Sequence, residues 1–209
     1  MNPTTNIPPP PRPRVLVSWS SGKDAAWTLH TLRMAGEVEV VGLLTSLNAE
    51  FDRVAMHSVR RTLVESQAEA AGLPLIIVPL PWPCSNVQYE TAMNCALEEA
   101  REKLAITHVA FGDLFLEDIR RYREEKMAQH TGLTPLFPLW ETPTDTLARQ
   151  MIAGGLRARL TCVDPCGEAG EFHTFAYDGP MFARPISVTL GEIVERDGFC
   201  FADLLPQPL

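Results

Sequence analysis

The sequence lacks the features of a membrane-spanning or disulfide-stabilised protein. No run of apolar residues reaches the roughly 18 that a transmembrane helix needs. The cysteines are odd in number and scattered along the chain, at Cys84, Cys95, Cys162, Cys166 and Cys200. Cysteines used in this way favour a reduced, cytoplasmic protein, and we expect no membrane partner.

Basic residues are also scarce. The chain has 18 Lys and Arg against 26 Asp and Glu, which gives a net charge of -8. This balance argues against binding nucleic acid through bulk electrostatics, although it does not exclude a local basic patch, so a nucleic-acid partner is not the expectation. Residues 1–13 are rich in proline and contain no apolar core of a secretory signal, so we expect a disordered tail.

Strand and helix patterns alternate through the first two-thirds of the chain. We predict strands at residues 15–19, 38–46, 75–80 and 107–111, and helices that begin at residue 23, span 57–71, begin after 85 and span 117–130. This alternation predicts a parallel sheet with helices on both faces, in a domain of residues 14–133.

The regular alternation of strand and helix patterns ends after residue 133. Three prolines, Pro135, Pro138 and Pro143, precede a predicted helix at 144–153 and short strands at 156–162, 172–177 and 184–190. We therefore predict a smaller α+β part over residues 134–209, on the substrate side.

The stretch RVLVSWSSGKDAAWTLHTL, residues 14–32, reads as a buried strand, a turn of small residues and a helix. Such a turn directs free backbone N–H groups and the positive end of the helix dipole at one point, which suits a phosphate. Ser18, Ser20 and Ser21 add hydroxyl groups, Gly22 permits close approach, and Lys23 adds a positive charge. An ordinary strand-to-helix turn rich in small residues is the alternative.

This turn is not a Walker A loop, because Val17 and Asp24 stand where that motif needs Gly and Ser or Thr. Two further polar groups, Thr45 with Ser46 and Gly112 with Asp113, follow predicted strands. In parallel sheets, ligands bind beyond these carboxyl ends. Asp113 could hold a magnesium ion, position a nucleophile or cap a helix.

A second polar stretch, CGEAGEFHTF, spans residues 166–175 and contains Glu168, Glu171 and His173. On a strand that starts at Phe172, the side chains of His173 and Phe175 face the same way. Two carboxylates and an imidazole could perform acid–base chemistry or bind a metal. A capped, solvated turn is the alternative.

These motifs carry a resemblance to a known family. SSGKDA at residues 20–25 resembles the SGGxDS loop of the PP-loop ATP pyrophosphatases. It is followed in order by MHSVR at 56–60, FGDL at 111–114, RRYRE at 120–124, GLTPLFPLW at 132–140, GEAGEFHTF at 167–175 and DGPMF at 178–182. Over residues 14–190 the chain is similar to the diphthine–ammonia ligase family, and its His-Thr motif resembles a bacterial branch.

The resemblance implies a PP-loop domain of the HUP type plus a smaller C-terminal part, ATP and magnesium as cofactors, and ATP-dependent amide formation. A carboxylate attacks the α-phosphorus, pyrophosphate leaves, and ammonia displaces AMP from the acyl adenylate. The expected partners are ammonia and a small-molecule or protein-borne carboxylic acid, and a homodimer is possible.

The expected site residues fall into four groups. Those that bind the nucleotide are Ser18, Ser20, Ser21, Gly22, Lys23, Asp24, Thr45, His57 and Gly112; those that bind the acceptor are Glu168, Glu171, His173 and Thr174. The expected catalytic residues are Lys23, Asp113, Glu168, Glu171 and His173, and Asp24 and Asp113 are the expected metal ligands.

The chain departs from the family pattern in three places. Ser21 replaces a Gly, Ala25 replaces a Ser, and Val163-Asp164 joins Cys166-Gly167 without the helical segment that family members usually carry there. Two other functions stay open: a PP-loop enzyme that modifies tRNA, which the cysteine spacing and the negative charge disfavour, and a nucleotide-binding protein without catalysis.

Overall fold

The fold of this chain, a computed structural model, is described for residues 11–164, 171–196 and 198–207. The first part contains β1 (Arg14–Ser18), α1 (Lys23–Ala35), β2 (Glu39–Asn48), β3 (Arg53–Val54), α2 (Arg61–Ala71), β4 (Leu75–Leu80), α3 (Asn86–Leu104), β5 (His108–Ala110), α4 (Glu117–Lys126), a π-helical turn (Met127–Thr131), β6 (Thr134–Leu136) and α5 (Thr144–Ala153). It is followed by β7 (Arg157–Asp164), β8 (Glu171–Asp178), β9 (Val188–Arg196) and β10 (Phe199–Pro206).

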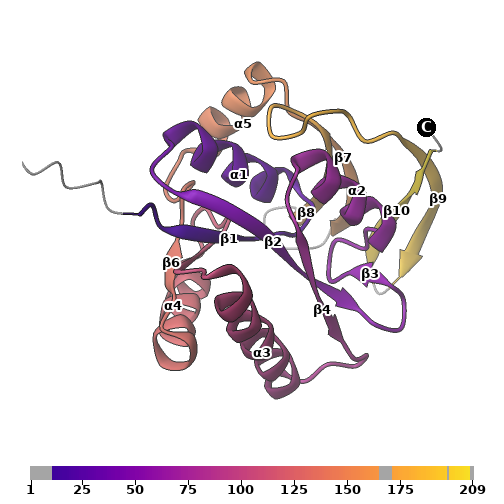
Figure 1. The fold of residues 1–209 in the computed structure, drawn as a ribbon. Coiled ribbons are helices and arrows are strands. Elements are labelled where there is room, and N and C mark those ends of the chain that lie inside the picture. The colour runs from indigo at the N-terminus through magenta and orange to yellow at the C-terminus, as the bar shows by residue number, and fades with distance from the viewer. Residues whose placement is uncertain (1–10, 165–170, 197, 208–209) are drawn as a thin grey trace, which may run out of the picture.

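The first sheet is parallel apart from one short strand. β1 lies between β2 and β5, β4 pairs with β2, and β6 pairs with β5, all in parallel. Only β3 runs antiparallel, against the end of β2. α1 and α2 cover one face and α3 and α4 the other (Figure 1). The predicted α/β class with helices on both faces is confirmed.

The central strand explains why both faces are covered. Val15 and Val17 point into the core under α1 and α2, whereas Leu16 points into the core under α3. All three side chains are fully buried. Because successive side chains of a strand alternate, a strand that is apolar throughout must be buried on both sides.

The second sheet is antiparallel, in the order β8-β7-β10-β9. Phe175 of β8 and Leu204 of β10 belong to the same buried cluster as Leu29 of α1 and Leu63 of α2. At the far end, Asp203 of β10 accepts from the guanidinium groups of both Arg53 and Arg60. The second sheet is therefore packed against the α1–α2 face of the first part (Figure 1).

Two predicted elements need correction, and further strands were not predicted. The helix predicted over 57–71 begins only at Arg61, because residues 54–59 form a closed loop in which Val54 N–H donates to the Val59 carbonyl. The strand predicted at 184–190 is wrong in its bounds, since β9 runs from Val188 to Arg196, and β10 was missed. β6, with a proline at its centre, was also missed.

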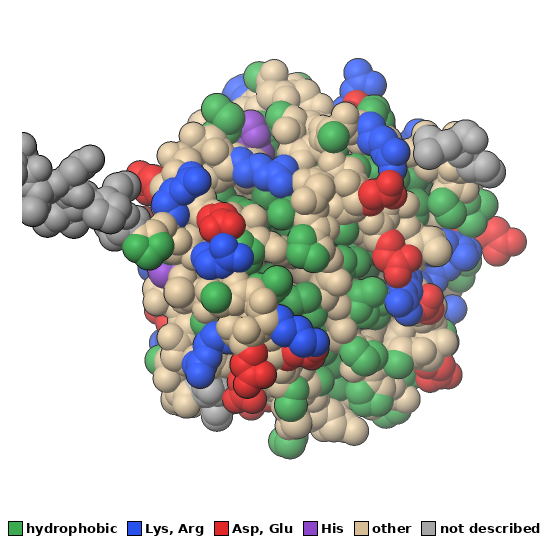
Figure 2. All heavy atoms as spheres, viewed as in Figure 1, with side chains coloured by type: hydrophobic (Ala, Val, Ile, Leu, Met, Phe, Trp, Pro, Cys, Tyr) green, Lys and Arg blue, Asp and Glu red, His purple; other side chains and the backbone are tan. Residues whose placement is uncertain are grey.

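The division at residue 133 stays a prediction. β6 begins just beyond it and still pairs with β5 of the first sheet. Most of the tail predicted over 1–13 lies outside the described residues. Among the helices that are described, none is both long and apolar enough to cross a membrane. On the face drawn in Figure 2, basic and acidic side chains are interspersed rather than gathered by sign.

Candidate functional site

The turn between β1 and α1 is strained at one residue. Ser21 has a φ of 71°, in the left-handed region that residues other than glycine rarely adopt. The similar SGGxDS motif has Gly here, which takes up this geometry without strain. Gly22 follows in an extended conformation at the start of α1, where it has no side chain to cap the helix.

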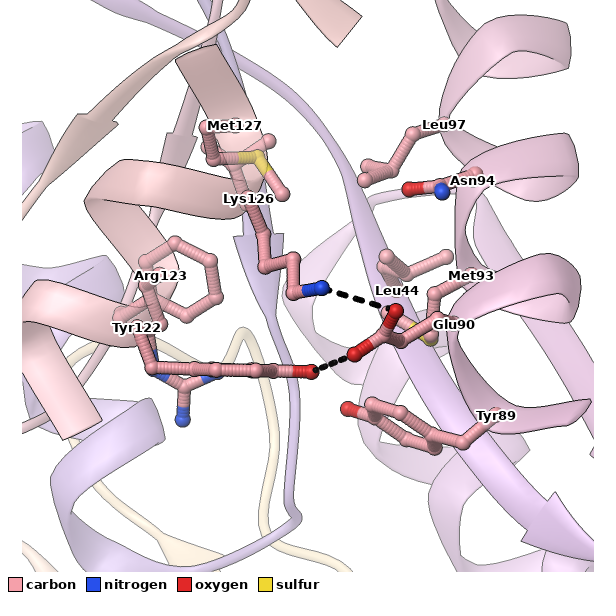
Figure 3. Close-up of a pocket in the computed structure, with 12 residues that line it drawn as sticks. Leu44, Tyr89, Glu90, Met93, Asn94, Leu97, Tyr122, Arg123, Lys126 and Met127 are labelled. Atoms are coloured by element: carbon pink, nitrogen blue, oxygen red, sulfur yellow. Dashed lines mark hydrogen bonds and ion pairs between the residues drawn. The ribbon is translucent and has the colours of Figure 1, made fainter. Parts of the chain in front are cut away.

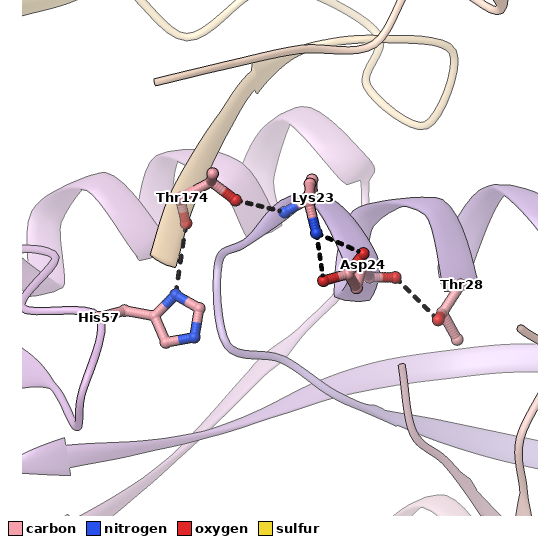
Figure 4. A network of polar contacts seen from close by, with 5 residues as sticks. All are labelled: Lys23, Asp24, Thr28, His57 and Thr174. Atoms are coloured by element: carbon pink, nitrogen blue, oxygen red, sulfur yellow. Dashed lines mark hydrogen bonds and ion pairs between the residues drawn. The ribbon is translucent and has the colours of Figure 1, made fainter. Parts of the chain in front are cut away.

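Strand β8 supplies the cap that the turn lacks. The Lys23 N–H donates to Thr174 Oγ1 at 3.0 Å, and the Ala176 N–H donates to the Ser21 carbonyl at 2.9 Å. A Cβ built on Gly22 would lie 3.2 Å from the Thr174 carbonyl oxygen, so glycine permits this close approach. The turn between β1 and α1 and the polar C-terminal motif therefore lie side by side in the fold (Figure 4).

His57 lies in the loop between β3 and α2. Its neighbours Met56 and Ser58 both have positive φ, 62° and 57°, and strain of this kind collects at functional sites. Nδ1 of His57 donates to the Thr174 carbonyl at 3.3 Å (Figure 4). Burial, and then the nearby His173, lower the pKa of His57 to about 4 although the bond to Thr174 raises it. The ring is therefore neutral at pH 7, with Nε2 as its acceptor.

His173 lies beside His57, with ring centres 4.5 Å apart and planes inclined by 42°. Burial lowers the pKa of His173, the Glu171 carboxylate opposes this, and Lys23 lowers the pKa further. Glu171 Oε1 is 3.5 Å from His173 Nε2, which is too long for an effective hydrogen bond. His173 is thus a neutral imidazole with a buried nitrogen that lacks a hydrogen-bond partner.

Unpartnered polar atoms gather around the turn. Four described side-chain atoms are buried without a hydrogen bond: Ser21 Oγ, Thr45 Oγ1, Thr161 Oγ1 and His173 Nε2. Three of these atoms lie in or beside the turn. Ser21 is part of the turn, His173 precedes Thr174, which accepts from Lys23 N–H, and Thr45 follows Leu44, whose carbonyl accepts from Trp19 N–H. Buried polar groups are normally paired, so these exceptions make the surroundings of the turn a candidate ligand site.

β5 approaches the start of α1 from the other side. A Cβ on Gly112 would lie 3.0 Å from the Asp24 carbonyl carbon and 3.1 Å from the Ala25 nitrogen, both backbone atoms. Asp113 then turns toward α4, where Arg123 Nε donates to Oδ2 at 2.6 Å. The Arg123 guanidinium also lies 4.2 Å from the centre of the Phe111 ring. Gly112 is thus at the turn, whereas Asp113 is engaged with α4.

The two expected metal ligands are both ion-paired. Both oxygens of Asp24 accept from Lys23 Nζ, at 2.7 and 2.9 Å, and both oxygens of Asp113 accept from Arg123. Either carboxylate would have to exchange a cation to coordinate magnesium. Among the described residues, no group of three or more His, Cys, Asp or Glu is placed to hold a metal.

The sequence analysis did not predict a role for Gln67 and Trp19, whose buried side chains form hydrogen bonds beneath the backbone of the turn. Both side chains are almost fully buried, and Trp19 Nε1–H donates to Gln67 Oε1 at 2.8 Å. The Gln67 amide nitrogen donates to the carbonyls of Ser21 and Ala176, at 2.9 and 2.7 Å. One signal was present: Gln67 is a polar residue four positions after Leu63, on the apolar side of its helix.

A hollow lies between α3 and α4, beside the same end of the sheet. Its floor is apolar, and Figure 3 shows Leu44, Met93, Leu97 and Met127 around it. Glu90 of α3 accepts from Tyr122 at 3.0 Å and from Lys126 at 2.9 Å, which ties the two helices together across the hollow. Burial, and then the hydrogen bond to the negatively charged Glu90, raise the pKa of Tyr122 to about 12.

The structure brings most of the predicted residues together. They meet at the carboxyl ends of β1, β2 and β5. The residues brought together are those of the Ser18–Asp24 turn, Thr45, His57, Gly112, and Glu171, His173 and Thr174 of β8. Asp113 faces Arg123 instead. Glu168 lies outside the described residues, as do Cys166, Gly167 and Gly170 of the same motif.

A parallel sheet of this order, with a donor-lined turn after its central strand, is the HUP-type fold of the nucleotide-binding PP-loop proteins. Residues 13–135 match the family model described as "Diphthamide synthase N-terminal domain", and residues 147–203 match "Diphthamide synthase C-terminal domain". The chain belongs to this diphthamide synthase family.

Curated relatives carry the name diphthine–ammonia ligase. The bovine and human proteins are each 25% identical over 237 residues, covering 90% of this chain and 88% of theirs. The zebrafish protein (Danio rerio) is 26% identical over 234 residues, covering 90% of this chain and 91% of its own. Because these alignments are longer than the 209-residue chain, the relatives carry residues that this chain lacks.

Proposed function

We propose that this protein is an ATP-dependent carboxylate–ammonia ligase that works through an acyl adenylate. A carboxylate oxygen of the acceptor attacks the α-phosphorus of ATP, the bond from that phosphorus to the bridging oxygen breaks, and pyrophosphate leaves. Ammonia then attacks the acyl carbon, AMP departs with the carbon–oxygen electron pair, and the nitrogen loses a proton to a base.

One observation carries the proposal: the hydrogen bond from Lys23 N–H to Thr174 Oγ1. It fixes the C-terminal motif against the phosphate turn, so a nucleotide on the turn and an acceptor on β8 would be neighbours. Holding two reactants together in this way lowers a barrier by several kcal/mol, roughly 7–11 in favourable cases.

The proposed roles follow from the contacts. The turn and Lys23 hold the phosphates, with Mg²⁺ as the counter-ion of the triphosphate, because oxygen-rich phosphates are its usual ligands. The apolar hollow lies next to the turn, because two of its lining residues come from strands beside the end of β1. Leu44 is paired with Ser18, and Phe111 follows Ala110, which is paired with Val17. The hollow therefore suits the adenosine end of the nucleotide. We assign to His173, a neutral imidazole whose Nε2 has no hydrogen-bond partner, the role of taking the proton from the incoming nitrogen.

The reaction products test this proposal. The protein is incubated with ATP, Mg²⁺, ammonium and a panel of carboxylic acids, and the spent nucleotide is separated by chromatography. We expect AMP and pyrophosphate in equal amounts, and a hydroxamate when hydroxylamine replaces ammonium, because hydroxylamine intercepts an acyl adenylate. ADP as the main product would contradict the proposal. ATP that binds but is never cleaved would favour a nucleotide-binding protein without catalysis.

Replacing Lys23 by alanine should weaken ATP binding by about 1.5–3 kcal/mol, the range for a charge-assisted contact. The ammonium group of Lys23 stands at the start of α1, where it adds to the positive end of the helix dipole. Isothermal titration calorimetry measures the effect, with Lys103→Ala as the matched control, because Lys103 is an exposed lysine of α3 that is paired with Glu99. An unchanged affinity in Lys23→Ala would remove the turn from the nucleotide site.

A further inference from the structure

Gln67 is a buried amide between the two parts of the molecule. It lies on α2, and its side chain is fully buried. Because the indole N–H of Trp19 can only donate, the amide oxygen of Gln67 must face it and the amide nitrogen must face away. That nitrogen meets two carbonyl oxygens, of Ser21 and of Ala176.

The two carbonyls belong to the two halves of the proposed site. Ser21 lies in the phosphate turn after β1, and Ala176 lies on β8 of the second sheet, two residues after Thr174. The Ser21 carbonyl also accepts from the Ala176 N–H, so three bonds join the turn, the amide and the strand. The register between turn and strand decides whether Thr174 Oγ1 reaches the Lys23 N–H.

We propose that Gln67 is a positioning residue that couples the nucleotide turn to the acceptor strand β8. This inference rests on the proposed function, because it assigns Gln67 to the step in which the two sides of the site react together. Gln67 touches neither reactant. It holds the strained Ser21 peptide and the β8 backbone in one register, so that the contact with Thr174 is kept.

Only glutamine has the atoms that this position needs. One acceptor faces the indole N–H and two donors face the two carbonyls. In a Gln67→Met variant the side chain keeps nearly the same length, but the Trp19 N–H and the carbonyls of Ser21 and Ala176 each lose their hydrogen bond to residue 67, and Ser21 keeps only its bond from the Ala176 N–H. In a Gln67→Glu variant the acceptor toward Trp19 stays, and at most one of the two donors is restored, when the new carboxyl group is protonated.

Hydrogen exchange on the full-length protein tests the coupling without needing turnover. Exchange is followed in the turn, residues 18–24, and in β8, residues 171–178, with and without ATP, for the wild type, Gln67→Met and Gln67→Glu. We expect ATP to slow exchange in both segments of the wild type and only in the turn of the variants. Thr131→Val is the control, because Thr131 is also buried and hydrogen-bonded but ends the π-helical turn that follows α4.

Kinetics adds a readout that a purely structural role would not move. Below the melting temperature of each variant, we expect kcat for amide formation to fall by roughly 30-fold or more and KM for ATP to change by less than about threefold, since reaction is sensitive to shifts of about 1 Å. Because lower pH also protonates the base His173, the comparison is with the wild type at each pH: the ratio of the Gln67→Glu kcat to the wild-type kcat should rise as the pH is lowered and the new carboxyl group gains a proton. Thr131→Val should melt earlier than the wild type and keep its kcat.

The outcomes separate the two proposals. If ATP alters exchange nowhere in the wild type, the proposed nucleotide site fails. If ATP protects the wild-type turn but not β8, or protects β8 in Gln67→Met and Gln67→Glu as well, the coupling role of Gln67 fails and the nucleotide site stands. If one of the two Gln67 variants does not fold, the other carries the test, because Gln67→Met removes all three hydrogen bonds of the side chain and Gln67→Glu removes fewer.

Discussion

Replacing His173 by asparagine should slow amide formation by about 10²–10⁴-fold, the usual range for loss of a general acid or base. The affinity for ATP should stay the same. The ring of His173 lies against His57, and its Nε2 is buried without a hydrogen-bond partner. Asparagine can form hydrogen bonds there but cannot take up a proton at neutral pH.

The measurement is the steady-state rate of amide or hydroxamate formation, together with the Kd for ATP by calorimetry. His108→Asn is the control, since His108 begins β5 at the opposite end of the sheet. A rate within threefold of the wild type would exclude His173 as the base. A large loss of ATP affinity would instead make it a nucleotide-binding residue.

The free energy of unfolding should fall as the pH is lowered from about 6.5 toward 4, and His57 should be a main cause. Burial depresses the pKa of His57 to about 4 in the folded protein, whereas it regains its ordinary value when the chain unfolds. Between these two pKa values the unfolded state binds a proton that the folded state does not bind. The contribution of His57 to the free energy of unfolding is therefore fully present above about pH 6.5 and is lost as the pH falls below it. This shift corresponds to about 2 kcal/mol by pH 5 and about 3 kcal/mol by pH 4.

Urea unfolding at pH 7.5, 6 and 5 checks this expectation. His57→Phe should lose about 2 kcal/mol less than the wild type between pH 7.5 and pH 5, because phenylalanine has no proton to take up. His30→Phe is a useful comparison, since burial lowers the pKa of His30 as well but that ring is less buried. Parallel losses in the wild type and His57→Phe would mean that the ring is open to water or paired in its charged form.

The sequence was sufficient for the parallel sheet because its signals are local. A strand such as 15–17, apolar throughout, has to be buried on both faces, and the turn that follows it contains the residues that a strand-to-helix connection at a phosphate site uses. The motif order then indicated the family to which the chain belongs. Predictions that rested on local pattern, such as α1, β4 and α5, were correct to within a residue or two.

The loop around His57 could not be predicted in this way. Residues 57–71 have apolar side chains at helical spacing, and the first turn of that pattern is overridden by contacts from distant parts of the chain. The His57 ring bonds to Thr174, which is 117 residues away. Left-handed conformations at Met56 and Ser58 are stable only where such contacts hold them.

The sequence by itself determined the parallel sheet with helices on both faces, the strand, turn and helix of residues 14–32, and most of the polar residues near that turn, although it did not reveal β6 and β10. Only the tertiary structure decided which of those residues meet: that Thr174 caps α1, that His57 and His173 lie against each other, that Asp113 is paired with Arg123, and that Gln67 joins turn and strand. The reason is physical. Hydrophobic periodicity and turn chemistry act over a few residues, whereas the partner of a buried polar group is set by packing between elements far apart in the chain.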